Sequence, residues 1–284
     1  FATDSWMDQH FETLCHAGGV RDQPTLDWQA VVNASEIACD RAKNIRYAPQ
    51  VFDKFDEALE QIKPIGAVIA FPPEGRLKTI TRFKTTRGFI LEKPIVASFR
   101  EAVAILELTK RRGQAIQVNY WHPANENLTK FFGPVLRSSL GELQPAAAIY
   151  RNNLHNNGSH LVDLIRLFAG DISADRACGE GSPSGPIIGN QNIPFLLKLQ
   201  GGAIIYCATV DFRHCRGFSI DLLGTIGRLA FFNESLSIQH SSAAKNQDLD
   251  STFEVAIDQP GTMQLRRCLA FRIMYDDLCD AISA

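Results

Sequence analysis

Short apolar runs alternate with amphipathic segments along roughly the first 120 residues. Apolar runs bounded by turn residues are typical of buried strands, and apolar positions three or four apart are typical of helices. Strands that alternate with single helices predict a parallel, doubly wound sheet. The strands expected in this part are 28–33, 66–70, 88–91 and 115–119, and the helices begin at Ser5 or span 35–43, 55–62, 77–85 and 98–113.

The pattern changes after Trp121, where alternating or apolar runs are joined by glycine turns. Such runs predict a mainly antiparallel sheet, which usually leaves one face for a ligand or another subunit. The α/β fold class therefore combines a domain over 1–121 with a second, α+β domain over 122–284. The second domain is expected to contain hairpins at 194–208 and 218–232, strands at 236–240 and 253–257, helices at 159–169 and 264–283, and a polar loop at 173–192.

The composition narrows the class of protein. The chain has 284 residues, 45% of them hydrophobic and 21% charged, as in an ordinary soluble protein, and a net charge of −2 gives no reason to expect nucleic acid or an anionic membrane as a partner. No apolar run approaches the ~20 residues that span a bilayer, and residues 1–20 do not resemble a secretory leader. The seven cysteines show no C-x-x-C spacing, which favours reduced thiols and a cytoplasmic location, and the histidines show no spacing that favours a metal site.

Lys93 follows the apolar strand 88–91 directly and precedes Pro94. A lysine cannot stay buried in a sheet without a partner, so it should emerge at the carboxyl end of the strand, where open α/β sheets bind their ligands. Pro94 stiffens this corner, and Ser98 with Glu101 forms a capping box that starts the next helix. The alternative is a surface turn with a solvated lysine.

Asn156 and His160 stand four residues apart at the start of the helix 159–169, a spacing that places them near one face. A helix N-terminus disfavours a protonated imidazole, so His160 is suited to accept a proton from an alcohol, with Asp163 placed to orient it. In the alternative interpretation Asn156 or Asn157 caps the helix, and His160 is a satisfied polar residue at a domain edge.

Two polar stretches are further candidates. Residues 151–160 are dense in side chains that donate or accept hydrogen bonds, which suits a polyhydroxylated ligand but also an ordinary turn cluster. Residues 119–122 (Asn-Tyr-Trp-His) follow a strand end, where they can contact a ligand or form an aromatic wedge that packs the domains together.

Four segments in this order resemble the Gfo/Idh/MocA oxidoreductases: Phe71-Pro72-Pro73, Glu92-Lys93-Pro94, Val118-Asn119-Tyr120 and residues 157–163 (Asn-Gly-Ser-His-Leu-Val-Asp). The resemblance covers almost the whole chain. It implies an N-terminal Rossmann domain, a C-terminal domain with a large open antiparallel sheet, and transfer of a hydride between NAD or NADP and a hydroxyl-bearing carbon of a sugar, cyclitol or nucleotide sugar. It also implies a homo-oligomer, a dimer or tetramer, formed through the open sheet.

The resemblance gives roles to residues at matching positions. Lys93 resembles the lysine beside the reacting hydroxyl, where it would stabilise the alkoxide, and His160 resembles the general acid/base. The candidate catalytic residues are Lys93, His160 and Asn156; the candidate cofactor-binding residues are Asn33, Ser35, Arg41, Phe71, Pro72, Glu92, Lys93 and Asn119; and the candidate substrate-binding residues are Tyr120, His122, Asn152 and Asn157.

The sequence departs from the family pattern in three ways. The first strand and its G-x-G-x-x-G turn are missing from 1–121, so we expect residues to be absent before Phe1 and also at the C-terminus. Asn33 stands where an NAD site carries a carboxylate, and with Ser35 and Arg41 nearby it leaves both NAD and NADP open. Asn156 replaces an aspartate of many relatives, and an amide cannot accept a proton.

Three functions are compatible with these features. The first is the NAD(P)-dependent dehydrogenase described above. The second is a non-catalytic sensor of a sugar or dinucleotide on the same fold, which would tolerate Asn33 and Asn156 but does not need both Lys93 and His160. The third, a purely structural oligomerisation module, explains the open sheet but neither polar constellation.

Overall fold

The computed structural model divides the chain into two compact units, which we call unit 1 (residues 1–124 and 267–284) and unit 2 (residues 125–266). The predicted fold class, a parallel sheet with helices followed by a larger sheet, is confirmed. Helix α10 (Arg267–Ser283) belongs to unit 1, although it follows unit 2 in the sequence. The structure describes residues 16, 23–32, 49–129, 134–183, 191–211, 213–215, 217–245, 253–255, 261–265 and 267–284.

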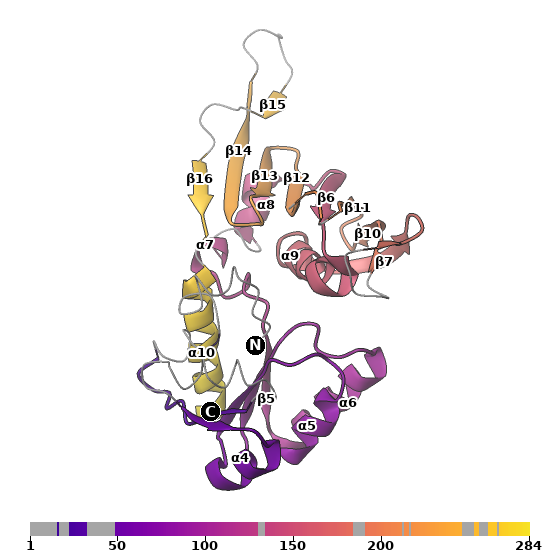
Figure 1. The fold of residues 1–284 in the computed structure, drawn as a ribbon. Coiled ribbons are helices and arrows are strands. Elements are labelled where there is room, and N and C mark those ends of the chain that lie inside the picture. The colour runs from indigo at the N-terminus through magenta and orange to yellow at the C-terminus, as the bar shows by residue number, and fades with distance from the viewer. Residues whose placement is uncertain are drawn as a thin grey trace. The chain divides into compact units, whose positions relative to one another are not determined.

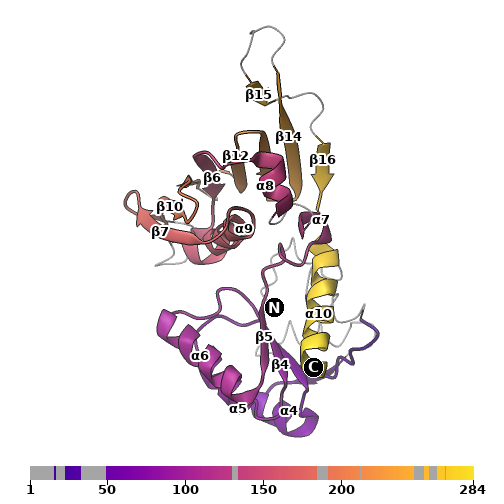
Figure 2. The same ribbon diagram turned by 180° about the vertical axis from the view of Figure 1, so that it is seen from behind.

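Unit 1 contains parallel strands connected by helices. Strands β3 (Gly66–Ile69), β4 (Gly88–Leu91) and β5 (Ala115–Val118) pair in that order, and β1 (Ala30–Val32) pairs with β2 (Gln50–Phe52). Helices α5 and α6 lie on one side of the three-stranded sheet and α10 lies on the other (Figures 1 and 2). The helices of this part are α4 (Phe55–Ile62), α5 (Arg76–Arg82) and α6 (Phe99–Arg112).

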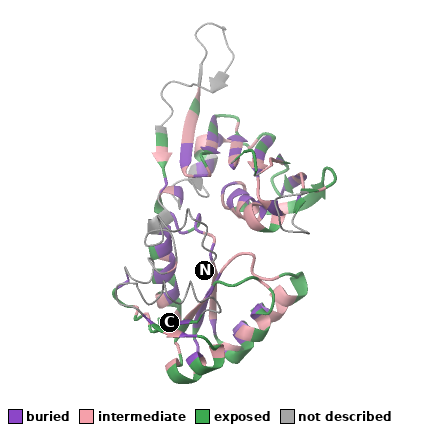
Figure 3. Ribbon diagram, in the orientation of Figure 1, coloured by how far each residue is buried: buried purple, intermediate pink, exposed green. Residues whose placement is uncertain are grey.

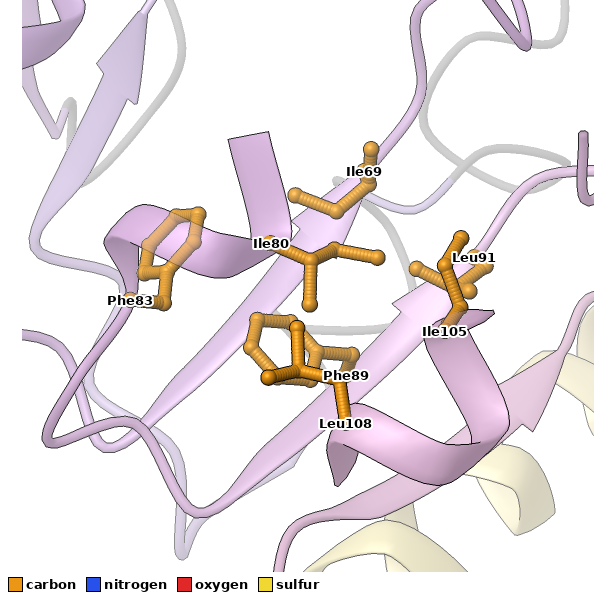
Figure 4. Close-up of a cluster of buried hydrophobic side chains, with 7 residues drawn as sticks. All are labelled: Ile69, Ile80, Phe83, Phe89, Leu91, Ile105 and Leu108. Carbon is orange, nitrogen blue, oxygen red and sulfur yellow. The ribbon is translucent and has the colours of Figure 1, made fainter. Parts of the chain in front are cut away.

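Strand β4 is buried on both faces, as a central parallel strand should be. Toward α10 the sheet carries Gly88, where an added Cβ would lie 2.8 Å from both Leu278 Cδ1 and Ile282 Cγ1, so the glycine allows the close approach of the helix. Toward α5 and α6 the sheet forms the apolar cluster of Figure 4, which consists of Ile69, Ile80, Phe83, Phe89, Leu91, Ile105 and Leu108.

Helix α6 begins and ends where its capping residues predict. The Ser98 Oγ accepts a hydrogen bond of 3.3 Å from the backbone N–H of Glu101, and Gly113 closes the helix with a φ of 62°. The segment that follows Lys93 is therefore fixed at its far end by a well-defined helix start.

Unit 2 is built around a nine-stranded sheet in the order β15-β14-β13-β12-β6-β11-β10-β7, with β16 also paired to β14. The expected hairpins β10–β11 and β12–β13 are present. The expected, mainly antiparallel sheet is present, with one parallel pair, β6 and β11: the chain between them passes through helix α9 (Ser159–Ala169) and strands β7 and β10 before it returns beside β6. The strands are β6 (Ala146–Tyr150), β7 (Ile172–Ala177), β10 (Phe195–Leu199), β11 (Ile204–Thr209), β12 (Ser219–Leu223), β13 (Gly227–Phe232), β14 (Ser237–Lys245), β15 (Phe253–Val255) and β16 (Gly261–Gln264).

The prediction of a loop over residues 173–192 was wrong in part. Residues 172–177 form β7, which pairs with β10, and β8 (Ser182–Pro183) pairs with β9 (Gln191–Asn192). Almost every residue of β7 is exposed. A strand with no buried face has no apolar alternation, so its sequence does not differ from that of a polar loop.

One face of the large sheet is covered by helix α9 (Ser159–Ala169), which buries Leu161, Leu164, Ile165 and Phe168. Phe168 packs against Phe231 of β13 with ring centroids 4.8 Å apart. The other face carries exposed apolar side chains, among them Tyr206, Leu223 and Phe232 (burial is coloured in Figure 3). Association of subunits through this face stays a prediction, which light scattering of the purified protein can check. Two short helices, α7 (Glu126–Thr129) and α8 (Pro134–Leu140), complete unit 2.

Within the described residues, no helix combines the length and the apolar character that crossing a membrane requires.

Candidate functional site

The carboxyl ends of β3, β4 and β5 lie at one edge of the parallel sheet. The last residues of the three strands, Ile69, Leu91 and Val118, are aligned in register. The pairing continues one residue further, because Glu92 N–H donates to Ile69 O (3.0 Å) and Asn119 N–H donates to Leu91 O (2.8 Å). The segments that follow the strands therefore leave the sheet side by side, at the edge where such sheets bind ligands.

Glu92 is the centre of a hydrogen-bond network at this edge. Its Oε1 lies 2.9 Å from His16 Nε2 and also accepts from Asn119 Nδ2, while its Oε2 accepts from the backbone N–H of Lys93 (3.2 Å). His16 Nδ1 in turn lies 3.0 Å from the hydroxyl of Tyr275 on α10. The carboxylate is thus held in one orientation by partners from distant parts of unit 1.

The charge on Glu92 is set by opposing effects. Burial alone would raise the pKa of its carboxyl, but hydrogen bonds from His16 and Asn119, together with the electrostatic effects of His16 and Lys93, leave the pKa below its usual value. Glu92 is therefore an ionised hydrogen-bond acceptor at neutral pH.

Asn119 offers a further acceptor at the same edge. The residue is only 7% exposed, and its Oδ1 atom is buried without a hydrogen-bond partner among the described residues. A buried carbonyl oxygen without a donor is costly, so this atom is suited to a hydroxyl or amide of a bound molecule.

Lys93 is half-buried and follows Glu92 at the end of β4. Its peptide bond to Pro94 is cis, a detail that the sequence did not indicate. The structure thus places Lys93 at the strand end where it was expected, next to Glu92 and Asn119.

Phe71 and Pro72 form the turn after β3, and both are exposed. The Phe71 carbonyl accepts hydrogen bonds from the guanidinium of Arg76, at 3.1 Å from Nε. The turn therefore has a fixed backbone and presents an aromatic ring to the surroundings.

Tyr120 and His122 are the remaining described candidates of unit 1. Tyr120 is half-buried, and His122 is only 1% exposed, with its ring 4.0 Å from the ring of Trp121. Both interpretations of residues 119–122, a ligand contact and an aromatic wedge, stay predictions. Three cofactor-binding candidates, Asn33, Ser35 and Arg41, lie outside the described residues.

In unit 2 the polar stretch after β6 forms a π-helix over Asn153–Gly158, which leads directly into α9. Asn156 lies in the π-helix and His160 in the first turn of α9, whereas both were expected in one α-helical turn. The residue before α9 is Gly158, so the cap by Asn156 or Asn157 that the alternative interpretation gave is not seen at the start of this helix.

The π-helix is held by one hydrogen bond from outside it and one within it. Asn152 and Asn153 have left-handed backbones, with φ of 56° and 63°. The N–H of Asn153 donates to Asn192 Oδ1 (2.9 Å), and the Asn153 side chain accepts from the N–H of Asn156 (2.7 Å). Asn192 comes from a segment that was expected to be loop, so its role was not apparent from the sequence.

An ion pair fixes the start of the same stretch. Arg151 forms a two-pronged pair with Glu234, with Nε 3.1 Å from Oε1, and both side chains are largely shielded from solvent. Glu234 lies between Asn233 and Ser235 in a turn of three residues with positive φ. Arg151 belongs to the polar stretch 151–160 that was a candidate for ligand contacts, whereas Glu234 had not been expected to contribute to the site.

Asp163, three residues after His160 on α9, has an Oδ2 atom that is buried without a hydrogen-bond partner among the described residues. Burial raises the pKa of its carboxyl to about 6, and the charge of Arg166 opposes this only in part. An acid with a raised pKa destabilises the folded state once it ionises.

We therefore expect Asp163→Asn to stabilise unit 2 relative to the wild type above pH 6. Because the folded pKa exceeds the unfolded one, the wild type keeps the full contribution of the protonated acid below about pH 4 and loses it as the pH rises through about 6. The gain for the variant at pH 8 should be about 1–3 kcal/mol, and it should vanish near pH 4.

Urea unfolding at a series of pH values measures this difference. The matched control is Asp175→Asn on the exposed strand β7, which should change stability by less than about 0.5 kcal/mol at every pH. A pH-independent effect of Asp163→Asn would contradict the prediction.

Among the described residues, no group of three or more His, Cys, Asp or Glu side chains is arranged to hold a metal ion.

Comparison with known proteins defines the class of fold. No protein-family model and no curated sequence matches the chain. Solved structures that share its fold include dehydrogenases and a 3-ketoreductase, in agreement with the fold implied by the resemblance to the Gfo/Idh/MocA oxidoreductases.

Three of these structures illustrate the likeness. Levoglucosan dehydrogenase, in complex with NADH and levoglucosan, is similar with a TM-score of 0.73 and 14% identity over 96% of this chain and 86% of that one. The 3-ketoreductase KijD10 from Actinomadura kijaniata, in complex with NADP, has a TM-score of 0.71 and 14% identity over 94% and 85%. The WlbA dehydrogenase from Chromobacterium violaceum, in complex with NADH and UDP-GlcNAcA, has a TM-score of 0.73 and 13% identity over 98% and 83%. At these identities the likeness shows a shared fold.

Proposed function

We propose that the chain is an NAD(P)-dependent oxidoreductase that transfers a hydride between the nicotinamide and a hydroxyl-bearing carbon of a sugar, cyclitol or nucleotide sugar. The observation that carries this proposal is the arrangement of Glu92, Lys93 and Asn119 at the carboxyl edge of a parallel sheet. Two acceptors and one cation at this edge suit a ligand that has both hydroxyl groups and an oxygen that becomes negative during the reaction.

The residues of unit 1 fit a nicotinamide dinucleotide. Its ribose hydroxyls can donate to the buried Asn119 Oδ1 and to the ionised Glu92, and Phe71 and Pro72 offer an exposed surface beside them. When bound, the nicotinamide supplies the site that accepts or donates the hydride. We leave NAD and NADP both open, with Asn33, Ser35 and Arg41 as the candidates for the adenosine ribose.

The solved structures that share the fold support the same class of reaction. They include complexes with NADH or NADP, and the ligands named with them are levoglucosan for one and UDP-GlcNAcA for another. These ligands make a sugar or nucleotide sugar the substrate class that we propose for this chain.

We assign the chemistry of the hydroxyl to two groups of the chain. His160 accepts the hydroxyl proton in the oxidation direction and returns it in reduction, while the Lys93 ammonium stabilises the alkoxide without itself changing protonation. Asn156 cannot take a proton, so its role is to orient the substrate by hydrogen bonds. Asn152, Asn157, Tyr120 and His122 complete the proposed substrate contacts.

A titration of the purified protein with NADH and with NADPH tests the proposal. Energy transfer from the three tryptophans to the reduced nicotinamide reports binding, and we expect saturable binding of one or both nucleotides. Asn119→Leu keeps a side chain of similar size without its polar atoms and should weaken binding by about tenfold.

The control variant is Gln61→Leu, which removes an amide from the exposed face of α4 and should leave the affinity unchanged. If a folded wild-type protein binds neither nucleotide, the dehydrogenase proposal is wrong and a non-catalytic sugar sensor becomes the better explanation of the fold.

A further inference from the structure

Arg76, the first residue of α5, is a charged side chain in the interior of unit 1. It is only 1% exposed, and its described side-chain hydrogen bonds all go to backbone carbonyl oxygens. Burial lowers the pKa of the guanidinium, while Glu92 and Glu74 oppose the shift. A buried cation whose described hydrogen bonds go only to backbone carbonyl groups needs a reason to be there.

The carbonyl groups that Arg76 contacts belong to two different segments. Nε and Nη2 donate to the carbonyl of Phe71, in the turn after β3. Nη1 donates to the carbonyls of Glu92 and Pro94, which flank Lys93, and to that of Ile95 at 3.0 Å. One side chain thus links the turn after β3 to both sides of the corner that carries Lys93.

Only an arginine can make this set of bonds. The guanidinium carries five N–H donors in a rigid plane, so it can donate hydrogen bonds to carbonyl groups of two segments at the same time. A lysine has one nitrogen, which can reach the carbonyl of Phe71 or those around Lys93 but not both. Without Arg76, the carbonyls of both segments lose these donors, and the two segments lose their common support.

We propose that Arg76 is a positioning residue that fixes the Lys93 corner (residues 92–95) relative to Phe71. The substrate beside Lys93 and the nicotinamide beside Phe71 are thereby held at a fixed distance from each other. The inference rests on the proposed function for the roles of Lys93 and Phe71, but the link between the two segments does not depend on it. Arg76 itself touches neither substrate nor cofactor.

The experiment compares Arg76→Ala and Arg76→Lys with the control Arg82→Ala. Arg82 lies on the same helix, has a partly exposed side chain and pairs with Asp56. Three quantities are measured on folded protein: amide hydrogen exchange of segment 92–98, the dissociation constants for NADH and NADPH, and the single-turnover rate with a sugar that the wild type oxidises.

For Arg76→Ala we expect exchange in segment 92–98 to rise by about tenfold or more and the single-turnover rate to fall by about a hundredfold. The affinity for NADH and NADPH should also fall. Millimolar ethylguanidinium, which fits the space left by the side chain, should restore all three quantities, whereas ethylammonium at the same ionic strength should not. Arg76→Lys should be intermediate, and Arg82→Ala should stay within about twofold of the wild type.

The proposal would be overturned if the Arg76→Ala variant showed wild-type hydrogen exchange in segment 92–98 and wild-type nucleotide affinity. An equal effect of Arg82→Ala, or rescue by ethylammonium, would also overturn it. If Arg76→Ala does not fold, Arg76→Lys decides: normal exchange in segment 92–98 overturns the proposal, and faster exchange confined to that segment supports it. Failure of the proposed function is seen separately, because a wild type that binds no nucleotide leaves the exchange test intact.

Discussion

Replacing Lys93 by methionine should lower the rate of hydride transfer by about a thousandfold while the protein stays folded. Methionine keeps an unbranched stem but has no charge, so an alkoxide forming beside residue 93 would lose its cation. The backbone should keep its place, because the preceding strand β4 is buried along its whole length. The loss should fall mainly on kcat, since the ammonium meets a negative charge that develops in the transition state.

Stopped-flow measurement of nicotinamide absorbance, in single turnovers with a sugar that the wild type oxidises, gives this rate. Lys110→Met, on the exposed end of α6, is the matched control and should react at the wild-type rate. Nucleotide affinity, measured in parallel, should change much less than the rate. A Lys93→Met variant that turns over normally would remove Lys93 from the mechanism.

The second large effect is expected at His160. His160→Asn should reduce turnover by about 10²–10⁴-fold, because an amide can hydrogen-bond the hydroxyl but cannot accept its proton. The wild-type rate of oxidation should increase with pH as the imidazole becomes neutral, and the variant should lose this dependence. A merely structural role would lower the rate without changing the shape of the pH profile.

The pH–rate profiles of the wild type and of His160→Asn decide between these outcomes. His214→Asn, at a side chain that is 81% exposed in the same unit, controls for the removal of an imidazole. An unchanged profile in His160→Asn would show that the proton leaves by another route. The same comparison on Asn156→Asp reports whether a carboxylate at this position enters the proton path.

Local sequence signals were sufficient for many elements. Helix α4 has the bounds expected from its apolar spacing, α9 has the expected bounds, and the caps of α6 are those that Ser98 and Gly113 predict. In each case the signal lies within the element itself. The rule that ligands bind at the carboxyl ends of parallel strands likewise placed Lys93 at the sheet edge where it lies, whereas Glu92 and Asn119 became candidates through the resemblance.

Features that depend on distant contacts were not predictable. The π-helix depends on Asn192, which lies 39 residues from its partner Asn153. The network around Glu92 depends on His16, at a separation of 76 residues, and no pattern near either residue indicates the contact. Arg76 gives no sign of its burial either, because a charged residue at the start of a helix is usually exposed.

The discontinuity of unit 1 has a consequence for the order of events during protein synthesis. Residues 125–266, which make up unit 2, are all available before α10 has been made, whereas unit 1 needs residues 267–284 to complete its core around Gly88 and its network through Tyr275. A ribosome adds roughly 5–20 residues per second, so the first 124 residues wait for several seconds with the α10 face of their sheet uncovered. The inserted unit should therefore fold first, and the edge that carries Glu92 and Lys93 should reach its final form only after translation of α10.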